Sequence, residues 1–146
     1  MNWQPLLDEL GQWQQIGRVA TFWWRDDDAI SDTPALRTLF SITDPLPIAI
    51  AAIPAKCDVT LSALLAGYSR VAVLQHGWRH LKNDGQASEF PATRNSKTVL
   101  AELQAGFTIL TELFESQFLP VMAPPFHGWS NDFTSRIATR TIRSVS

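Results

Sequence analysis

Two histidines stand four residues apart in the segment His76-Gly77-Trp78-Arg79-His80. At this spacing both imidazoles can reach one metal ion if the segment turns as a helix or a tight loop. Histidines are also common at surfaces and in cores, where local hydrogen bonds satisfy them. Taken alone, the pair leaves a metal site and ordinary histidines open.

Three consecutive carboxylates, Asp26, Asp27 and Asp28, provide an acidic counterpart. Adjacent carboxylates repel one another, and their proximity is costly unless a cation or an arginine offsets the charge. The alternative is a solvated turn in which Asp26 or Asp28 caps the loop before the next helix. Combined with the histidine pair, the triplet favours a hydrolytic metal site, which needs a few ligands, an open position for water and a nearby base.

Other reactive or aromatic side chains fit less well. Cys57 follows an expected strand, but no histidine or acid is placed as its partner, so a buried thiol is the better interpretation. His127 could act as a general acid, but it is better interpreted as an exposed loop residue. Trp78, Phe126 and Trp129 lie near the expected edge of the site, although core packing is the more common role of large aromatic residues.

Strand and helix patterns alternate between these segments. Apolar residues at helical spacing and runs of β-branched or aromatic residues predict, in order, a helix over 3–17, a strand over 18–25, a helix over 34–42, a strand over 48–53, a helix over 59–68, a strand over 70–75, a helix over 99–114, a strand over 118–122, a helix over 129–139 and the start of a strand over 141–146. This alternation predicts parallel strands with right-handed crossovers in a single α/β layered or barrel domain over 1–146.

The acids, the histidines and Pro124-Pro125 all follow the carboxyl ends of expected strands. These ends lie side by side at one edge of a parallel sheet, so we expect the three segments to converge there. The strand before the acids is rich in aromatic residues. We expect it at the centre of the sheet, with Phe22 and Trp24, or else Thr21 and Trp23, buried.

The composition excludes several classes of protein. Of the 146 residues, 45% are hydrophobic and 18% charged, and the net charge of -2 leaves no basic stripe for nucleic acid. A single cysteine allows no intrachain disulfide. The N-terminus lacks the pattern of a secretory signal, and no apolar run is long enough to span a bilayer. We therefore expect a cytoplasmic protein that binds neither nucleic acid nor membranes.

These segments resemble the motifs of a divergent branch of the polysaccharide deacetylases, the NodB homology domains of carbohydrate esterase family four. The first motif of the family is a strand ending in two aspartates, and Trp24-Arg25-Asp26-Asp27-Asp28-Ala29 is similar to it. The second is a histidine pair separated by three residues, which His76 and His80 match. The third is an arginine followed by prolines and an aromatic residue, and Ala123-Pro124-Pro125-Phe126 resembles it without the arginine.

The resemblance implies an incomplete (β/α) barrel that removes acetyl groups from N-acetylated carbohydrate with the help of zinc or a similar divalent ion. The implied residues are Asp27 as general base, with a shift of one residue left open; Asp28, His76 and His80 as metal ligands; Trp78, Pro125 and Phe126 as substrate contacts; and Asp26 and Arg25 in support. The family's arginine orients the base, and Arg25 or Arg79 is the candidate to replace it.

The resemblance spans nearly all of this chain but only the earlier part of a typical domain of the family. The later motifs, which supply a further acidic partner and a histidine that acts as general acid, have no counterpart. We therefore expect a truncated domain that binds metal with weak or no turnover alone, and whose unclosed sheet edge favours homo-oligomers. An inactive metal-binding remnant and an amidohydrolase acting on a non-sugar amide are the alternatives.

Overall fold

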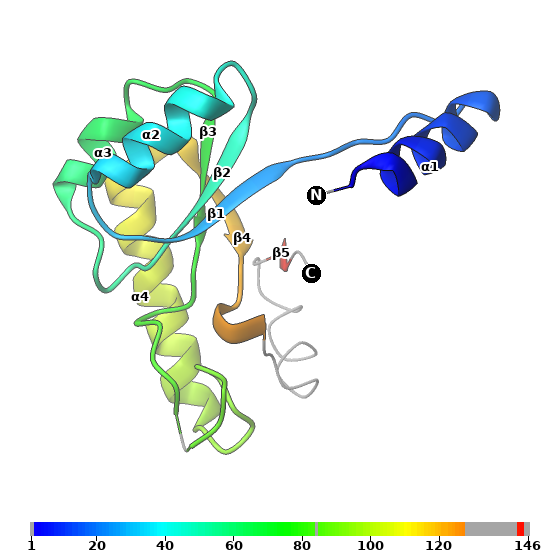
Figure 1. Ribbon diagram of the computed structural model, residues 1–146. Helices are drawn as coiled ribbons and strands as arrows, with labels where there is room; N and C mark the ends of the chain where they lie inside the picture. The colour runs from blue at the N-terminus through cyan, green and yellow to red at the C-terminus, as the bar shows by residue number, and fades with distance from the viewer. Residues whose placement is uncertain (1, 84, 128–142, 145–146) are drawn as a thin grey trace.

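A computed structural model of the chain describes residues 2–83, 85–127 and 143–144 (Figure 1). The elements are, in chain order, α1 (Gln4–Gln15), β1 (Trp24–Ala29), α2 (Pro34–Thr43), β2 (Ile48–Ala52), α3 (Val59–Leu65), β3 (Val71–Gln75), α4 (Ser96–Phe114), η1 (Glu115–Gln117), β4 (Phe118–Met122), η2 (Pro125–His127) and β5 (Arg143–Ser144). The strands form one parallel sheet in the order β1-β2-β3-β4-β5. The predicted alternation of strands and helices is confirmed.

The helices that follow strands begin at polar caps. The Thr33 hydroxyl accepts the backbone N–H of Leu36 at the start of α2, before Pro34 at the first helical position. Asp58 and Asn95 accept backbone N–H groups at the starts of α3 and α4 in the same way. Such side chains satisfy donors that the first helical turn leaves unpaired, and they fix where each helix begins.

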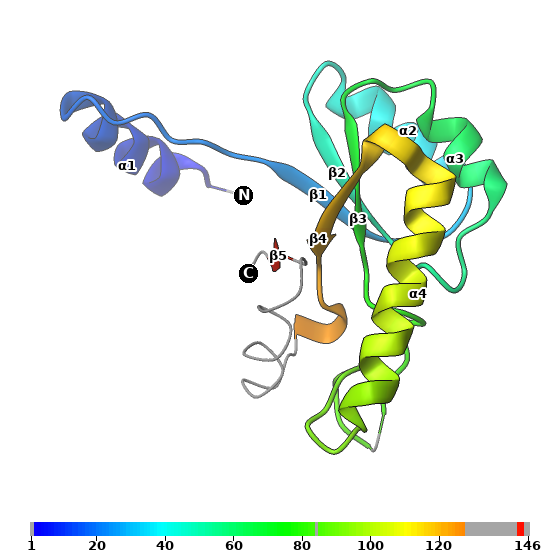
Figure 2. The same cartoon turned by 180° about the vertical axis from the view of Figure 1, so that it is seen from behind.

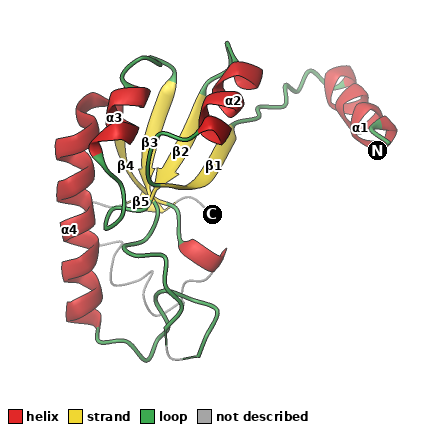
Figure 3. Cartoon of the chain, turned by 60° about the vertical axis from the view of Figure 1, so that its left-hand side comes forward, coloured by secondary structure: helices red, strands yellow, loops and turns green. Residues whose placement is uncertain are grey.

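One face of the sheet carries the main core. Every residue of β2 is buried, as expected of an apolar strand inside a parallel sheet. Helices α2, α3 and α4 pack against the alternate residues of β2 and β3, and α1 stands apart (Figures 2 and 3). The core residues that they bury together are Leu36, Phe40, Ile48, Ile50, Ala52, Leu61, Leu64, Leu65, Val71, Val73, Leu110 and Phe114.

The expected burial of the aromatic strand is wrong. Strand β1 begins only at Trp24 and lies at the edge of the sheet, where β2 is its single neighbour among the described strands. Phe22 is 70% exposed and Trp24 is 49% exposed, and the alternates Thr21 and Trp23 are exposed as well. Trp23 and Trp24 line an apolar hollow with Leu74 on the sheet face opposite the three helices. The aromatic residues therefore border an open face, because none of the described helices covers it.

The ends of the chain show further differences from expectation. Helix α1 ends at Gln15, and none of its twelve residues, all of them described, is buried. Gly17 follows with a φ of 69°, the left-handed conformation expected after a helix. The helix expected over 129–139 lies outside the described residues, whereas the strand expected over 141–146 is described at Arg143–Ser144. Within the described part of the chain, no helix has the length and apolar character needed to cross a bilayer.

We expect Gly106→Ala to destabilise the protein even though alanine is the better helix former. A Cβ atom at Gly106 would lie 2.5 Å from Nε2 of Gln75 and 2.9 Å from Cγ of Pro54, so α4 would have to move away from the sheet. The free energy of unfolding, measured with urea, should fall by about 1–3 kcal/mol. In Gly11→Ala, the matched control, the new Cβ meets nothing within 4 Å and should leave the core unaffected. Equal stability of the two variants would contradict the close packing of α4.

Candidate metal centre

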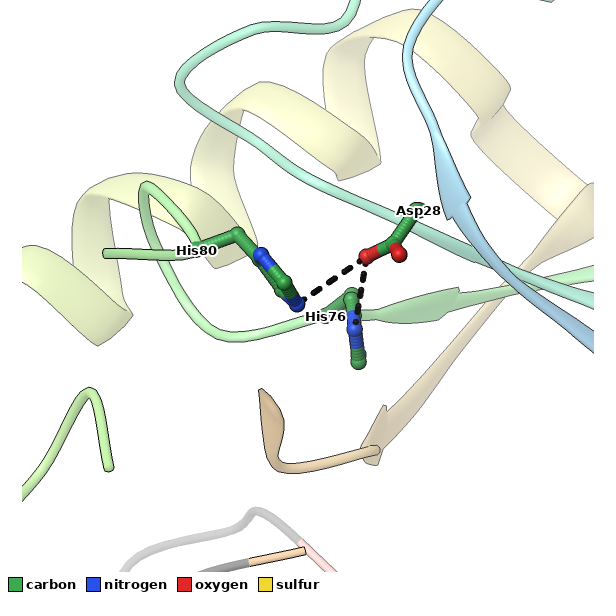
Figure 4. A group of neighbouring side chains, drawn as sticks. All are labelled: Asp28, His76 and His80. Atoms are coloured by element: carbon green, nitrogen blue, oxygen red, sulfur yellow. Dashed lines mark ion pairs between the residues drawn. The ribbon is translucent and has the colours of Figure 1, made fainter. Parts of the chain in front are cut away.

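Three residues from two strand ends and one loop meet at the carboxyl edge of the sheet. Asp28 lies near the end of β1, His76 directly follows β3, and His80 lies four residues further on (Figure 4). Oδ1 of Asp28 is 3.2 Å from Nε2 of His76 and 3.1 Å from Nε2 of His80. The candidate ligand atoms of all three lie within 4.8 Å of one another. The predicted convergence of this carboxylate with the two imidazoles is confirmed.

An irregularity in β1 directs Asp28 toward the histidines. The register between β1 and β2 shifts between Asp26 and Ala29, and Asp28 has a φ of 71°. A bulge of this kind bends a strand and re-aims its side chains. The carboxylate of Asp28 is 59% exposed, so it can also reach a ligand from solvent.

The ring of His76 is held in one orientation. Its side chain is 4% exposed, and Nδ1 lies 2.8 Å from the backbone oxygen of Ala123, the residue that follows β4. A carbonyl oxygen can only accept a hydrogen bond, so Nδ1 carries a proton and the neutral ring keeps its lone pair on Nε2. Nε2 is the atom that faces Asp28. A hydrogen bond from the far ring nitrogen is the usual way in which proteins orient a metal-binding histidine.

His80 is placed by a strained loop. Its φ is 54°, and its ring lies 4.4 Å from the ring of Phe126 and 5.1 Å from that of His76, measured between centroids. Phe126 also has a positive φ, 59°. Non-glycine residues rarely adopt this backbone conformation, and where it persists it is often tied to function. At this edge of the sheet it occurs at Asp28, His80 and Phe126 together.

The donor set fits a divalent metal ion. Two imidazole nitrogens and one carboxylate oxygen make a three-ligand set of the kind found in catalytic zinc sites, which leave a further position open. With zinc–ligand bonds of about 2.0–2.1 Å, ligand atoms of a tetrahedral site lie about 3.3 Å apart. The 3.1 and 3.2 Å separations in the protein are close to that value. Asp28, His76 and His80 could therefore hold one divalent ion, whose identity the ligands leave open.

Asp27 and Arg25 form a two-point ion pair beside the ligands. Nε of Arg25 is 2.8 Å from Oδ1 of Asp27, and a second guanidinium nitrogen, Nη2, is 3.1 Å from Oδ2. Both side chains are about one-third exposed or less. Arg79, the other candidate to replace the family's arginine, instead lies over the Trp78 ring at 5.9 Å. Arg25 is therefore the arginine that the fold places on the predicted base.

Asp26, the first carboxylate of the triplet, has a raised pKa. Partial burial raises the pKa of Asp26, and the negative charges of Asp27 and Asp28 raise it further. The repulsion expected from three adjacent acids is thus present, and it acts on the residue furthest from the histidine cluster in sequence. Arg25 offsets the charge of Asp27.

The residues predicted to contact substrate are placed differently from one another. Trp78 and Phe126 are half-buried at the rim of the site. Pro125 is fully buried, and a Cβ atom at Gly77 would lie 2.6 Å from its ring. This burial does not fit the predicted substrate contact of Pro125, whose ring instead supports the His76–His80 loop. Trp129 and the side chain of His127 lie outside what the structure describes.

Sequence reasoning missed Glu89, which lies in the segment expected to be irregular. Its carboxylate accepts the backbone N–H groups of Trp78, Arg79 and His80 at 3.1, 2.6 and 3.0 Å. The residue is 2% exposed, which is unusual for a glutamate. No local pattern marks it, because its partners lie nine to eleven residues earlier in the chain.

Cys57 should react slowly with iodoacetamide in the folded protein. The thiol is half-buried, and burial raises its pKa to about 11. Only the thiolate reacts, and with this pKa about one thiol in a thousand is ionised at pH 8. We expect alkylation at pH 8 to be at least about tenfold slower in the folded chain than in the same chain unfolded in urea, where the thiol regains its ordinary pKa. Equal rates would contradict the raised pKa of Cys57 and would show that folding does not protect the thiol.

Known proteins resemble this chain in structure rather than in sequence. No protein-family model and no curated protein matches the sequence. Among solved structures, a Streptococcus mutans CE4 esterase is similar, with a TM-score of 0.64 and 14% sequence identity. The similarity covers 85% of this chain and 54% of the esterase chain, so this chain spans about half the length of the protein that it matches. The resemblance drawn from the motifs is thus confirmed at the level of the fold alone, which matches part of the fold of that CE4 esterase.

Proposed function

We propose that this chain is a metal-dependent hydrolase domain that removes acetyl groups from N-acetylated carbohydrate. The observation that carries the proposal is the cluster of Asp28, His76 and His80 at the carboxyl edge of a parallel sheet with the fold of a CE4 esterase. In α/β folds of this kind the loops at that edge form the active site. Two imidazoles and one carboxylate are a ligand set suited to zinc.

The residues beside the cluster fit the steps of amide hydrolysis. A divalent ion held by Asp28, His76 and His80 would polarise the acyl carbonyl and lower the pKa of a water molecule. Asp27 is the proposed general base, because it precedes the ligand Asp28 directly in the sequence and its carboxylate is oriented by the Arg25 guanidinium. The two-point pairing with Arg25 holds the Asp27 carboxylate in one orientation.

The substrate is proposed from the rim of the site. Trp78 and Phe126 present half-buried aromatic rings that could pack on the apolar face of a sugar. Lys82 lies over the Phe126 ring at 5.5 Å and adds a positive charge to the same rim. A small non-sugar amide is the alternative substrate, and a comparison of N-acetylated oligosaccharides with simple acetamides would separate the two.

We expect the purified protein to bind about one equivalent of zinc and to lose most of it in Asp28→Asn and His80→Ala. Each substitution weakens or removes one of only three protein ligands. Elemental analysis after dialysis against limiting zinc measures the occupancy. Asp44→Asn, which removes an exposed carboxylate just after α2, is the matched control and should retain the metal. Loss of zinc in all three variants, or in none, would contradict the assigned ligands.

We expect weak turnover of N-acetylated oligosaccharides, because no described residue matches the family's final general acid. Whatever turnover exists should fall by about 10²- to 10⁴-fold in Asp27→Asn, since positioned proton transfer typically contributes that much. Zinc content should stay unchanged, which separates the base from the ligands. His76→Ala should lose both metal and turnover. Metal binding without any turnover in the parent chain would identify a metal-binding domain instead of a hydrolase, whereas robust turnover would show that no further acid is needed.

A further inference from the structure

A buried carboxylate organises the loop that carries His80. Both oxygens of Glu89 face the backbone of this loop: Oε2 accepts the N–H of Trp78, and Oε1 accepts those of Arg79 and His80. Trp78, Arg79 and His80 lie outside the helices and strands, so no helix or sheet ladder provides acceptors for their N–H groups. Left unpaired in a half-buried loop, they would be costly, and one carboxylate satisfies all three.

Gly77 provides the space for this contact. A Cβ atom at position 77 would lie only 2.0 Å from Oε2 of Glu89, closer than any non-bonded approach allows. Gly77 also has a φ of 62°, which glycine adopts without strain. Its carbonyl oxygen accepts a hydrogen bond from the buried Gln75 side chain. Residues 77–80 of the loop therefore all lie against the Glu89 carboxylate.

Glu89 is itself held in place from behind. Its backbone oxygen accepts hydrogen bonds from Nδ2 of Asn83 and from Nη1 of Arg94. Arg94 also forms an ion pair with Glu102 in α4, with Nη1 2.9 Å from Oε2 of the glutamate. The carboxylate is thus connected through its own backbone to the longest helix of the domain. It can act as a rigid support for the loop.

The position of His80 depends on this support. The φ of 54° at His80 is unfavourable for a residue with a side chain, so the surroundings must hold it. The N–H of His80 is one of the three groups that Glu89 binds, and the imidazole of the same residue faces Asp28. Partners behind the ligands commonly control metal affinity in this way.

We propose that Glu89 is a positioning residue for the metal centre, which fixes the His76–His80 loop so that His80 meets Asp28 and His76. Through this loop, Glu89 sets the affinity for the divalent ion without touching it. The inference rests on the proposed metal site. Substitution of Glu89 should therefore weaken metal binding, whereas a substitution that only lowers the stability of the protein should not.

The test is a cobalt titration of Glu89→Gln, followed by the visible absorption of the bound ion. Glutamine keeps the size of the side chain, but one of its two terminal atoms becomes an N–H donor that faces the Trp78 N–H. We expect the Kd for Co²⁺ to rise by about 10- to 100-fold, with an altered absorption band. Glu89→Asp, which keeps the carboxylate but draws it back by one methylene, should also weaken binding, and it decides the question if Glu89→Gln fails to fold.

The matched control is Gln117→Met at the opposite edge of the sheet. Nε2 of Gln117 lies within 3.0 Å of the backbone oxygens of Leu65 and Tyr68, so its loss removes a similar loop support far from the site. This variant should lose thermal stability but keep the parent Kd for cobalt. An unchanged Kd in the folded Glu89 variants would overturn the role of Glu89, and so would an equal rise of the Kd in Gln117→Met. Neither result would overturn the metal site itself. Absence of cobalt binding in the parent chain would overturn the metal site and this inference together.

Discussion

The candidate site depends on backbone conformations that side chains normally disfavour. Asp28, His80 and Phe126 all have φ between 54° and 71°, and each lies where the chain leaves a strand or turns at its end. Such conformations persist only where neighbouring groups hold them. At His80 those groups are the Glu89 carboxylate and the Phe126 ring. At Asp28 the shift in register between β1 and β2 accompanies the unusual backbone.

The sheet supplies the rigid part of this arrangement. His76 continues the ladder, since its N–H donates to Ala52 O, and its ring is tied to Ala123 after β4. The ligands thus come from β1 and from the end of β3, and β4 fixes the orientation of one of them. Because β3 lies inside the sheet and most of its residues are buried, the position of His76 is set by the same packing that holds the core. The positions of Asp28 and His80 depend instead on the irregularity in β1 and on the loop that follows β3.

Short-range patterns in the sequence predicted most of this structure. Helical spacing, caps such as Thr33 and the apolar run of β2 predicted the elements. The order of the strand ends predicted that Asp28 meets His76 and His80, and the resemblance to the deacetylase motifs proposed them as metal ligands. The burial of Phe22 and Trp24 was predicted wrongly. Hydrophobic residues indicate that burial of a strand would be favourable, but they do not show whether another strand or helix packs against it. Glu89 was missed for a related reason. Its role follows from backbone groups it meets in space, and backbone groups leave no signature in the sequence.

Gly77 and Glu89 also act as a pair with a consequence for how this sequence can change. The space that a side chain at position 77 would need is filled by the Glu89 carboxylate and by the Pro125 ring. A chain that acquires a larger residue at 77 can retain the loop only if residue 89 becomes shorter and another acceptor takes over the three N–H groups. Substitutions at these two positions are therefore coupled, because a change at only one of them would give a protein with a less stable loop. In a set of diverged sequences, the two positions should change together or stay together.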